Sequence, residues 1–226
     1  MKRISTLLIL VVLVTFTSCH RYYTSSAFEQ KTSKHKTIAV LPPKMVLTGN
    51  QPKSLTETDI VKLEERDSRY FQESLYNNIL AKSNQGKYEM YVSVQPPANT
   101  LSLLEKNNIS IRDSWAKDDK ELATILGVDA VVRSSIQKNR IMSDLASAGI
   151  EVGRRIAGAV LNNPTTVGMG MNRTNDIQAT CSVVSNGETL WNDTYQRDSN
   201  FANTANEVIE NITSKFAKHF PYRKKA

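Results

Sequence analysis

The chain has 226 residues, which is enough for one sizeable domain or at most two small ones. It carries 29 lysines and arginines against 22 aspartates and glutamates, a formal net charge of +7, and only two cysteines. Two cysteines exclude a scaffold held together by several disulfides. The basic residues are scattered without the interleaved aromatic residues that single-strand binders use, so no nucleic-acid partner is predicted.

Residues 1–18 have the pattern of a secretory signal peptide. Two basic residues precede an apolar segment at 4–16, whose 13 residues are too few for a membrane span but suit the core of a signal. The segment leads to Cys19, and this ending resembles the lipobox of bacterial lipoproteins, with Phe16 where leucine is usual. The resemblance implies cleavage before Cys19 and acylation of that residue. The alternative interpretation is an ordinary signal peptide with a chance cysteine.

Acylation at Cys19 implies membrane lipid as a partner of the chain. One acyl chain binds a bilayer only marginally, whereas several anchor a protein durably. The anchor also implies a domain outside the cytosol. The cysteine is followed by His20 and not by an acidic residue. By resemblance to lipoprotein sorting rules in other bacteria, we expect the protein in the outer membrane, facing the periplasm.

Both ends of the mature chain are polar and basic. Residues 19–36 are predicted to be a flexible tether, with Tyr22 and Tyr23 placed to lie at the lipid interface. Residues 221–226 contain the run Arg-Lys-Lys and are predicted to be a basic tail. Such charge favours contact with anionic lipid or cell-wall polymer, although a solvated charged surface also explains it.

The residues between these ends, 37–220, are predicted to form one domain of alternating strands and helices. Short apolar, β-branched runs bounded by prolines or by a glycine predict strands at 37–41, 88–94 and 128–136. Apolar positions three and four residues apart predict helices at 57–83, with a break near Asp67, and at 101–107, 110–127 and 203–220. Gly127 is placed to end the third of these helices.

Two alternating runs over 177–197 meet at Asn186-Gly187. This dipeptide tolerates the positive φ angles of a type I′ turn, so a β-hairpin is predicted. Cys181, in the first run, has no partner in the chain once Cys19 is the anchor, and it is predicted to be a small buried residue. The element order predicts an α/β single-domain layered sandwich with a mixed β-sheet, helices packed on it, a C-terminal β-hairpin and a closing helix.

Three segments resemble a set of bacterial envelope lipoproteins that includes CsgG, LpoB, the amino-terminal domain of TolB and the DUF799 lipoproteins. They are "IAVLPP" at 38–43, "LATILGVDAVVRSSI" at 122–136 and "ATCSVVSNGETLW" at 179–191. In that set a Gly-Val-Asp-Ala segment leads into a core strand, and a turn glycine, here Gly187, precedes a tryptophan, here Trp191. The resemblance implies the fold and an accessory protein that docks or assembles in the envelope without a cofactor. The motifs are structural, so they imply no particular activity.

Residues 142–175 interrupt this pattern and are predicted to be an insert of one helix and a loop. Small residues four apart form an apolar stripe, and Glu151 and Arg154 fall on the opposite face. A stripe of this kind lets another backbone approach closely. That neighbour is the chain's own sheet, another subunit or a membrane surface. The candidate partner interface is made of the stripe and two loop methionines: Gly149, Gly153, Ile156, Ala157, Val160, Met169 and Met171.

No catalytic or metal-binding pattern stands out in the sequence. The three histidines lack zinc-site spacing, and no Gly-x-Ser-x-Gly motif is present. We therefore expect no cofactor and no enzymatic activity. The expected function is an accessory, assembly or docking subunit in envelope biogenesis or export, with an envelope protein or further copies of itself as partner. The alternatives are an oligomeric subunit like that of the secretion channel, and a periplasmic module that binds a small ligand or polysaccharide.

Overall fold

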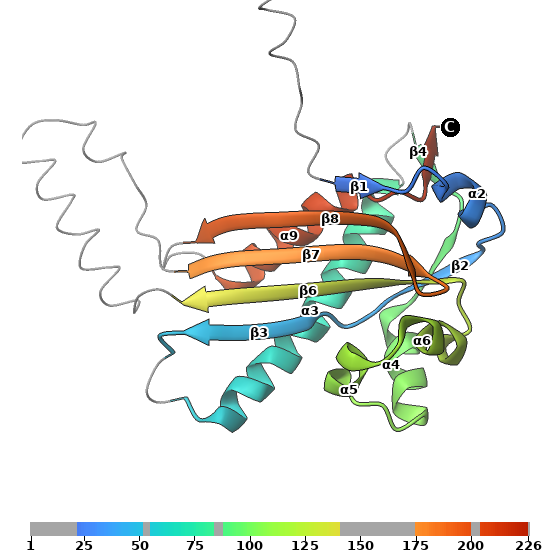
Figure 1. Ribbon diagram of the computed structural model, residues 1–226. Helices are drawn as coiled ribbons and strands as arrows, with labels where there is room; N and C mark the ends of the chain where they lie inside the picture. Colours follow the sequence, from blue (N-terminus) through green and yellow to red (C-terminus); the bar gives the residue numbers. More distant parts are fainter. Residues whose placement is uncertain (1–21, 52–54, 84–87, 141–174, 200–203, 226) are drawn as a thin grey trace, which may run out of the picture.

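The computed structural model describes residues 22–51, 55–83, 88–140, 175–199 and 204–225 (Figure 1). The strands are β1 (Tyr22–Thr24), β2 (Thr37–Val40), β3 (Lys44–Gly49), β4 (Tyr88–Met90), β5 (Ser93–Gln95), β6 (Ala130–Arg140), β7 (Asn175–Ser185), β8 (Glu188–Ser199) and β9 (Arg223–Lys225). The helices are α2 (Phe28–Thr32), α3 (Glu57–Ser83), α4 (Pro97–Lys106), α5 (Ile111–Ala116), α6 (Asp119–Leu126) and α9 (Ala205–Lys218).

Seven strands form one mixed sheet in the order β1-β8-β7-β6-β2-β5, and β3 also pairs with β6. The pairs β1–β8, β8–β7 and β7–β6 are antiparallel, whereas β2 and β3 run parallel to β6 and β5 runs parallel to β2. Strands β2 and β3 occupy successive stretches of one edge of β6. Pro42 and Pro43 separate them, because proline has no N–H to donate to a ladder. The remaining two strands, β4 and β9, form a separate antiparallel ribbon.

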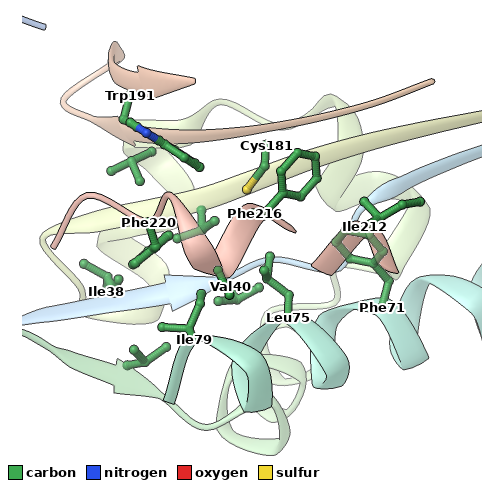
Figure 2. Packing of buried hydrophobic residues seen from close by; sticks show 14 of the residues in the cluster. Ile38, Val40, Phe71, Leu75, Ile79, Cys181, Trp191, Ile212, Phe216 and Phe220 are labelled. Carbon is green, nitrogen blue, oxygen red and sulfur yellow. The ribbon is translucent and has the colours of Figure 1, made fainter. Parts of the chain in front are cut away.

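The main core lies between the sheet and the helix pair α3 and α9, which cover one face of it (Figure 1). Figure 2 shows side chains of both helices meeting residues of β2 and β7, including Val40 and Cys181. A second, smaller core joins the opposite face to α4 and α6. In β2, Ile38 and Val40 face the main core, and Ala39 faces the smaller one. Burial on both faces explains why β2 is apolar without alternation.

The predicted fold class is confirmed, and so is the hairpin. Asn186 and Gly187 take φ angles of 51° and 78° at the turn between β7 and β8, as a type I′ turn requires. The strands β6, β7 and β8 have 11, 11 and 12 residues and are longer than the sequence indicated. Their outward rows are polar, and Gln137 lies beside Gln178, which lies beside Gln196.

Two predicted helices differ from the structure in their continuity, and the helix predicted at 101–107 begins four residues earlier, as α4. Helix α3 continues through Asp67 without the predicted break. The predicted helix at 110–127 is instead two helices, because Asp118 begins a new one by accepting hydrogen bonds from the amides of Lys120 and Glu121, both at 3.0 Å. Gly127 ends α6 with a φ of 66°, as predicted.

The flexible tether predicted at 19–36 is wrong over the residues described there, 22–36. β1 pairs with β8, and α2 packs on the domain through Phe28, which is 5% exposed, and Thr32, which is 1% exposed. These two side chains lie one helical turn apart, on one side of α2, and attach an otherwise polar segment to the domain.

The basic tail predicted at 221–226 is also corrected. Tyr222 is fully buried, and its ring centroid lies 5.3 Å from that of Phe28. The next three residues form β9 and pair with β4. In the part of the chain that the structure describes, no helix is both long and apolar enough to cross a membrane.

Candidate functional site

The two ends of the described chain meet on one side of the domain. Figure 1 shows β1, α2 and β4 next to the C-terminal end, beyond the β1 edge of the sheet. We call the surface formed by residues 22–29, 88–91 and 218–224 the terminal surface. It contains the first described residues after Cys19 together with Arg223 and Lys224, so it is where an anchored N-terminus would meet the domain.

A buried carboxylate holds β1 and α9 to the sheet. Asp193 lies opposite Tyr22 in the β1–β8 register and is fully buried. Its Oδ1 accepts hydrogen bonds from the amide of Thr194 at 2.7 Å and from Lys215 Nζ at 3.1 Å, and its Oδ2 lies 2.9 Å from His219 Nδ1. The ring of Tyr22 stacks on that of His219 with centroids 5.0 Å apart. With each oxygen paired, the buried carboxylate is compensated, and the cluster has a structural role.

A second polar network joins the start of β2 to the end of the chain. The two ring nitrogens of His35 lie 2.7 Å from the hydroxyl of Tyr222 and 3.3 Å from that of Ser185. Burial lowers the pKa of His35, although the charge of Asp129 opposes this shift. The Ser185 hydroxyl donates at 2.8 Å to the carbonyl oxygen of Asp129. Because its proton is directed away from His35, this serine–histidine pair does not form an activated nucleophile.

Two basic side chains of β9 lie over aromatic rings on the terminal surface. The guanidinium carbon of Arg223 is 5.7 Å from the ring centroid of Tyr88, and Nζ of Lys224 is 4.9 Å from that of Tyr91. Arg223 donates from Nε to the carbonyl oxygen of Phe220 at 3.2 Å and from Nη2 to that of Lys218. No described residue accepts a hydrogen bond from Arg223 Nη1 or from Lys224 Nζ. Charged donors of this kind form strong hydrogen bonds with anionic groups.

The terminal surface contains a hollow of about 470 Å³ beside these donors. Its wall includes Tyr22, Glu29, Tyr91, His219, Arg223 and Lys224. Two permanent cations therefore oppose one carboxylate, and tyrosine rings supply apolar surface. A second hollow of about 480 Å³ lies between α3, α4 and α5 and has the opposite charge, with Glu65, Glu105 and Asp113 against Arg69. The charge of the terminal hollow favours an anionic group with an apolar neighbour.

The predicted lipidation residue, Cys19, and the predicted interface residues lie outside the described part of the chain: Gly149, Gly153, Ile156, Ala157, Val160, Met169 and Met171. The ends of their segment are described, and Arg140 pairs with Asn175 across β6 and β7. Cys181 is confirmed as a buried residue, and burial raises the pKa of its thiol to about 12. Within the described ranges, no group of three or more His, Cys, Asp or Glu residues is arranged to hold a metal ion.

Sequence reasoning missed the polar cluster around Asp193, although a signal for it exists. Trp191, Asp193 and Tyr195 occupy alternate positions in a strand whose other alternate residues are polar. Alternation therefore places a carboxylate on the buried face, where it needs partners. Lys215 and His219 are one helical turn apart and supply them. The composition of residues 19–36 concealed the third component, β1.

No family model and no curated protein matches the chain. Solved structures that are similar to it include the lipoprotein GNA1162 from Neisseria meningitidis, which is 14% identical over 81% of this chain and 96% of that chain, with a TM-score of 0.47. A PelC dodecamer from Paraburkholderia phytofirmans is 11% identical over 88% and 93%, with a TM-score of 0.39. The C-terminal domain of LpoB from Salmonella enterica is 14% identical over 73% and 84%, with a TM-score of 0.32. Likeness at this level assigns this chain neither an activity nor a partner.

Proposed function

We propose that the protein is a lipid-anchored envelope protein without enzymatic activity, acylated at Cys19, whose domain docks or assembles a partner close to the membrane. The observation that supports this most is the position of β1. Only two residues separate Cys19 from Tyr22, and three residue steps span at most about 11 Å. Because β1 pairs with β8, the anchor joins the sheet with little slack.

A short connection has a mechanical consequence for an anchored domain. A flexible linker lets a domain sample many orientations, whereas an anchor attached to an edge strand keeps one side of the domain toward the bilayer. The other sides then face the compartment and are available to partners, at a concentration raised by the shared membrane. We place the protein in the outer membrane, facing the periplasm, because His20 and not an acidic residue follows the cysteine.

We assign the contact with that partner to the insert between β6 and β7. Arg140 and Asn175 are neighbours in the sheet, so a hairpin loop of about two to five residues would close this connection. The chain instead places 34 residues, 141–174, between them. The insert is therefore more than the hairpin needs. Its small-residue stripe, with Gly149 and Gly153, suits close contact with an envelope protein or a second copy of the chain.

The anchor is tested by expressing the full chain in a diderm bacterium fed radioactive palmitate. We expect label in the protein, a mass that matches acylation at Cys19, and recovery in the outer-membrane fraction. The Cys19→Ala variant should carry no label and lose durable attachment. An unlabelled wild-type protein would refute the anchor, as would a Cys19→Ala form that stays membrane-bound with unchanged mass.

The partner contact is tested by crosslinking in cells with a Gly149→Leu/Gly153→Leu variant. The leucines should prevent close approach and remove the wild-type crosslinks, while the thermal midpoint of the purified protein stays unchanged. Glu151→Leu is the matched control, because it places the same side chain on the opposite face of the predicted helix and should leave the crosslinks intact. A wild-type chain that is monomeric and crosslinks to nothing would remove the basis for this assignment.

A further inference from the structure

The hollow on the terminal surface carries an inference about the membrane itself. We infer that it binds the phosphate group of an anionic phospholipid in the bilayer that holds the anchor. This inference rests on the proposed anchoring at Cys19, and it adds a specific site on the folded domain for a headgroup.

The electrostatics of the hollow fit a phosphate. Arg223 and Lys224 both line it, and Arg223 Nη1 and Lys224 Nζ have no hydrogen-bond acceptor among the described residues. The two hydrogen bonds from Arg223 to main-chain oxygens hold its guanidinium in place, so little side-chain freedom is lost on binding. Glu29 is the carboxylate in the wall, and it leaves the site with an excess of positive charge.

The exposed tyrosines of the terminal surface fit the interface between headgroups and acyl chains. Four large apolar or aromatic side chains are exposed in the described part of the chain, and three of them lie on β1 and β4: Tyr22, Tyr23 and Tyr88. Tyr22 lines the hollow itself. Tyrosine is favoured at membrane interfaces because its ring is apolar and its hydroxyl is polar. A free phosphate ion would use the cations and gain nothing from these rings.

The position of the anchor fits the same assignment. Tyr22 lies within about 11 Å of Cys19 along the chain, because three residue steps cannot span more. The polar headgroup layer on each side of a bilayer is roughly 5–8 Å thick. A side chain this close to an acylated residue therefore lies at or next to the headgroup layer, and the hollow beside Tyr22 is brought to lipid phosphates.

The test separates the hollow from the anchor by using the mature chain, residues 19–226, with Cys19→Ser. This protein contains every described residue and carries no acyl chain. Its binding to phosphatidylcholine vesicles with and without phosphatidylglycerol is measured by co-sedimentation at about 0.1 M salt, where the Debye length is about 10 Å. We expect binding only to the vesicles that contain phosphatidylglycerol, and weaker binding as the salt concentration rises.

Variants that remove either a cation or the carboxylate of the hollow test whether binding depends on this site. A Lys or Arg near an anionic surface contributes about fivefold to partitioning, which is about 1 kcal/mol. Arg223→Gln and Lys224→Gln should therefore each weaken binding about fivefold, and the double variant about 25-fold. Glu29→Gln, in the same wall, should strengthen binding. Lys120→Gln on α6 is the control, since it removes an exposed cation outside the terminal surface, and it should change binding less than twofold.

The possible outcomes decide between the sources of the anion. If Lys120→Gln and Lys224→Gln weaken vesicle binding equally, the protein is attracted to the anionic surface by its overall charge and not through a specific site, and the inference is overturned. Titration with inorganic phosphate that saturates the hollow, together with no vesicle binding, would also overturn it in favour of a soluble anion. If the full chain is acylated but the Cys19→Ser form does not bind anionic vesicles, the headgroup site is refuted and the proposed anchoring is not. If the variants change vesicle binding as expected but Cys19 carries no label, the proposed anchoring is refuted and the headgroup site is not.

Discussion

Replacing Phe28 with alanine measures how firmly the N-terminal segment is built into the domain. Phe28 is 5% exposed and lies edge-on to Tyr222, with ring centroids 5.3 Å apart. Burial of about 150–250 Å² of a phenylalanine side chain contributes at most about 4–6 kcal/mol to the free energy of unfolding. Measured substitutions of buried phenylalanine by alanine cost about 3–5 kcal/mol. We expect Phe28→Ala to fall in that measured range.

Thermal unfolding followed by circular dichroism provides the assay for this loss. In a domain of this size, each kcal/mol lowers the midpoint by about 2–4 °C, so a fall of about 6–20 °C is expected. Limited proteolysis should also show faster cleavage within residues 22–36. Tyr23→Ala is the matched control, because that side chain is 55% exposed and should change stability by less than about 0.5 kcal/mol. A Phe28→Ala protein with an unchanged midpoint and unchanged cleavage would show that the segment is a loose tether and refute the reasoning.

Three further predictions concern other parts of the molecule. Burial lowers the pKa of His35, so on acidification the unfolded chain takes up a proton before the folded one does. Stability should therefore fall as the pH drops from about 7 to 5, and in His35→Gln this part of the pH dependence should vanish. Parallel curves of thermal midpoint against pH for the two proteins would contradict this prediction. Burial raises the pKa of the Cys181 thiol to about 12, so in a Cys19→Ser chain it should not react with Ellman's reagent at about pH 8 until urea unfolds the protein. Rapid reaction in the native state would show that this thiol is accessible. Asp118→Ala removes the N-cap of α6 and should cost about 1 kcal/mol in urea unfolding, and Ser110→Ala, which removes the N-cap of α5, serves as comparison.

The elements that are predictable from this sequence are those with a single dominant signal. Strand β2 and the first part of β6 are apolar because they are buried on both faces, and the hairpin follows from one dipeptide at its turn. Strand β3 has no such signal. It begins directly after two prolines, and Met45 is its one buried residue, so pairing with β6 and not its own composition makes it a strand.

The terminal surface is not predictable from local patterns, because long-range contacts create it. Tyr22 is a strand residue only because Asp193 lies opposite it, 171 positions later in the chain. Tyr222 is buried in part because Phe28 and His35, far from it in the sequence, pack on it. Segments read in isolation show charge and hydroxyl groups and therefore suggest a tether and a tail. The few side chains that attach these segments to the domain are too sparse to produce a regular spacing of apolar residues in the sequence.

Under the proposed export and anchoring, the pairing of β1 with β8 sets the order in which the protein matures. A chain threaded across the inner membrane from its N-terminus presents residues 22–24 long before residues 191–193, which supply their hydrogen-bond partners. The first strand thus stays unpaired until most of the polypeptide has been translocated. If Cys19 is acylated as proposed, that delay is the interval in which the acylating enzymes act on a chain whose first strand is still unpaired.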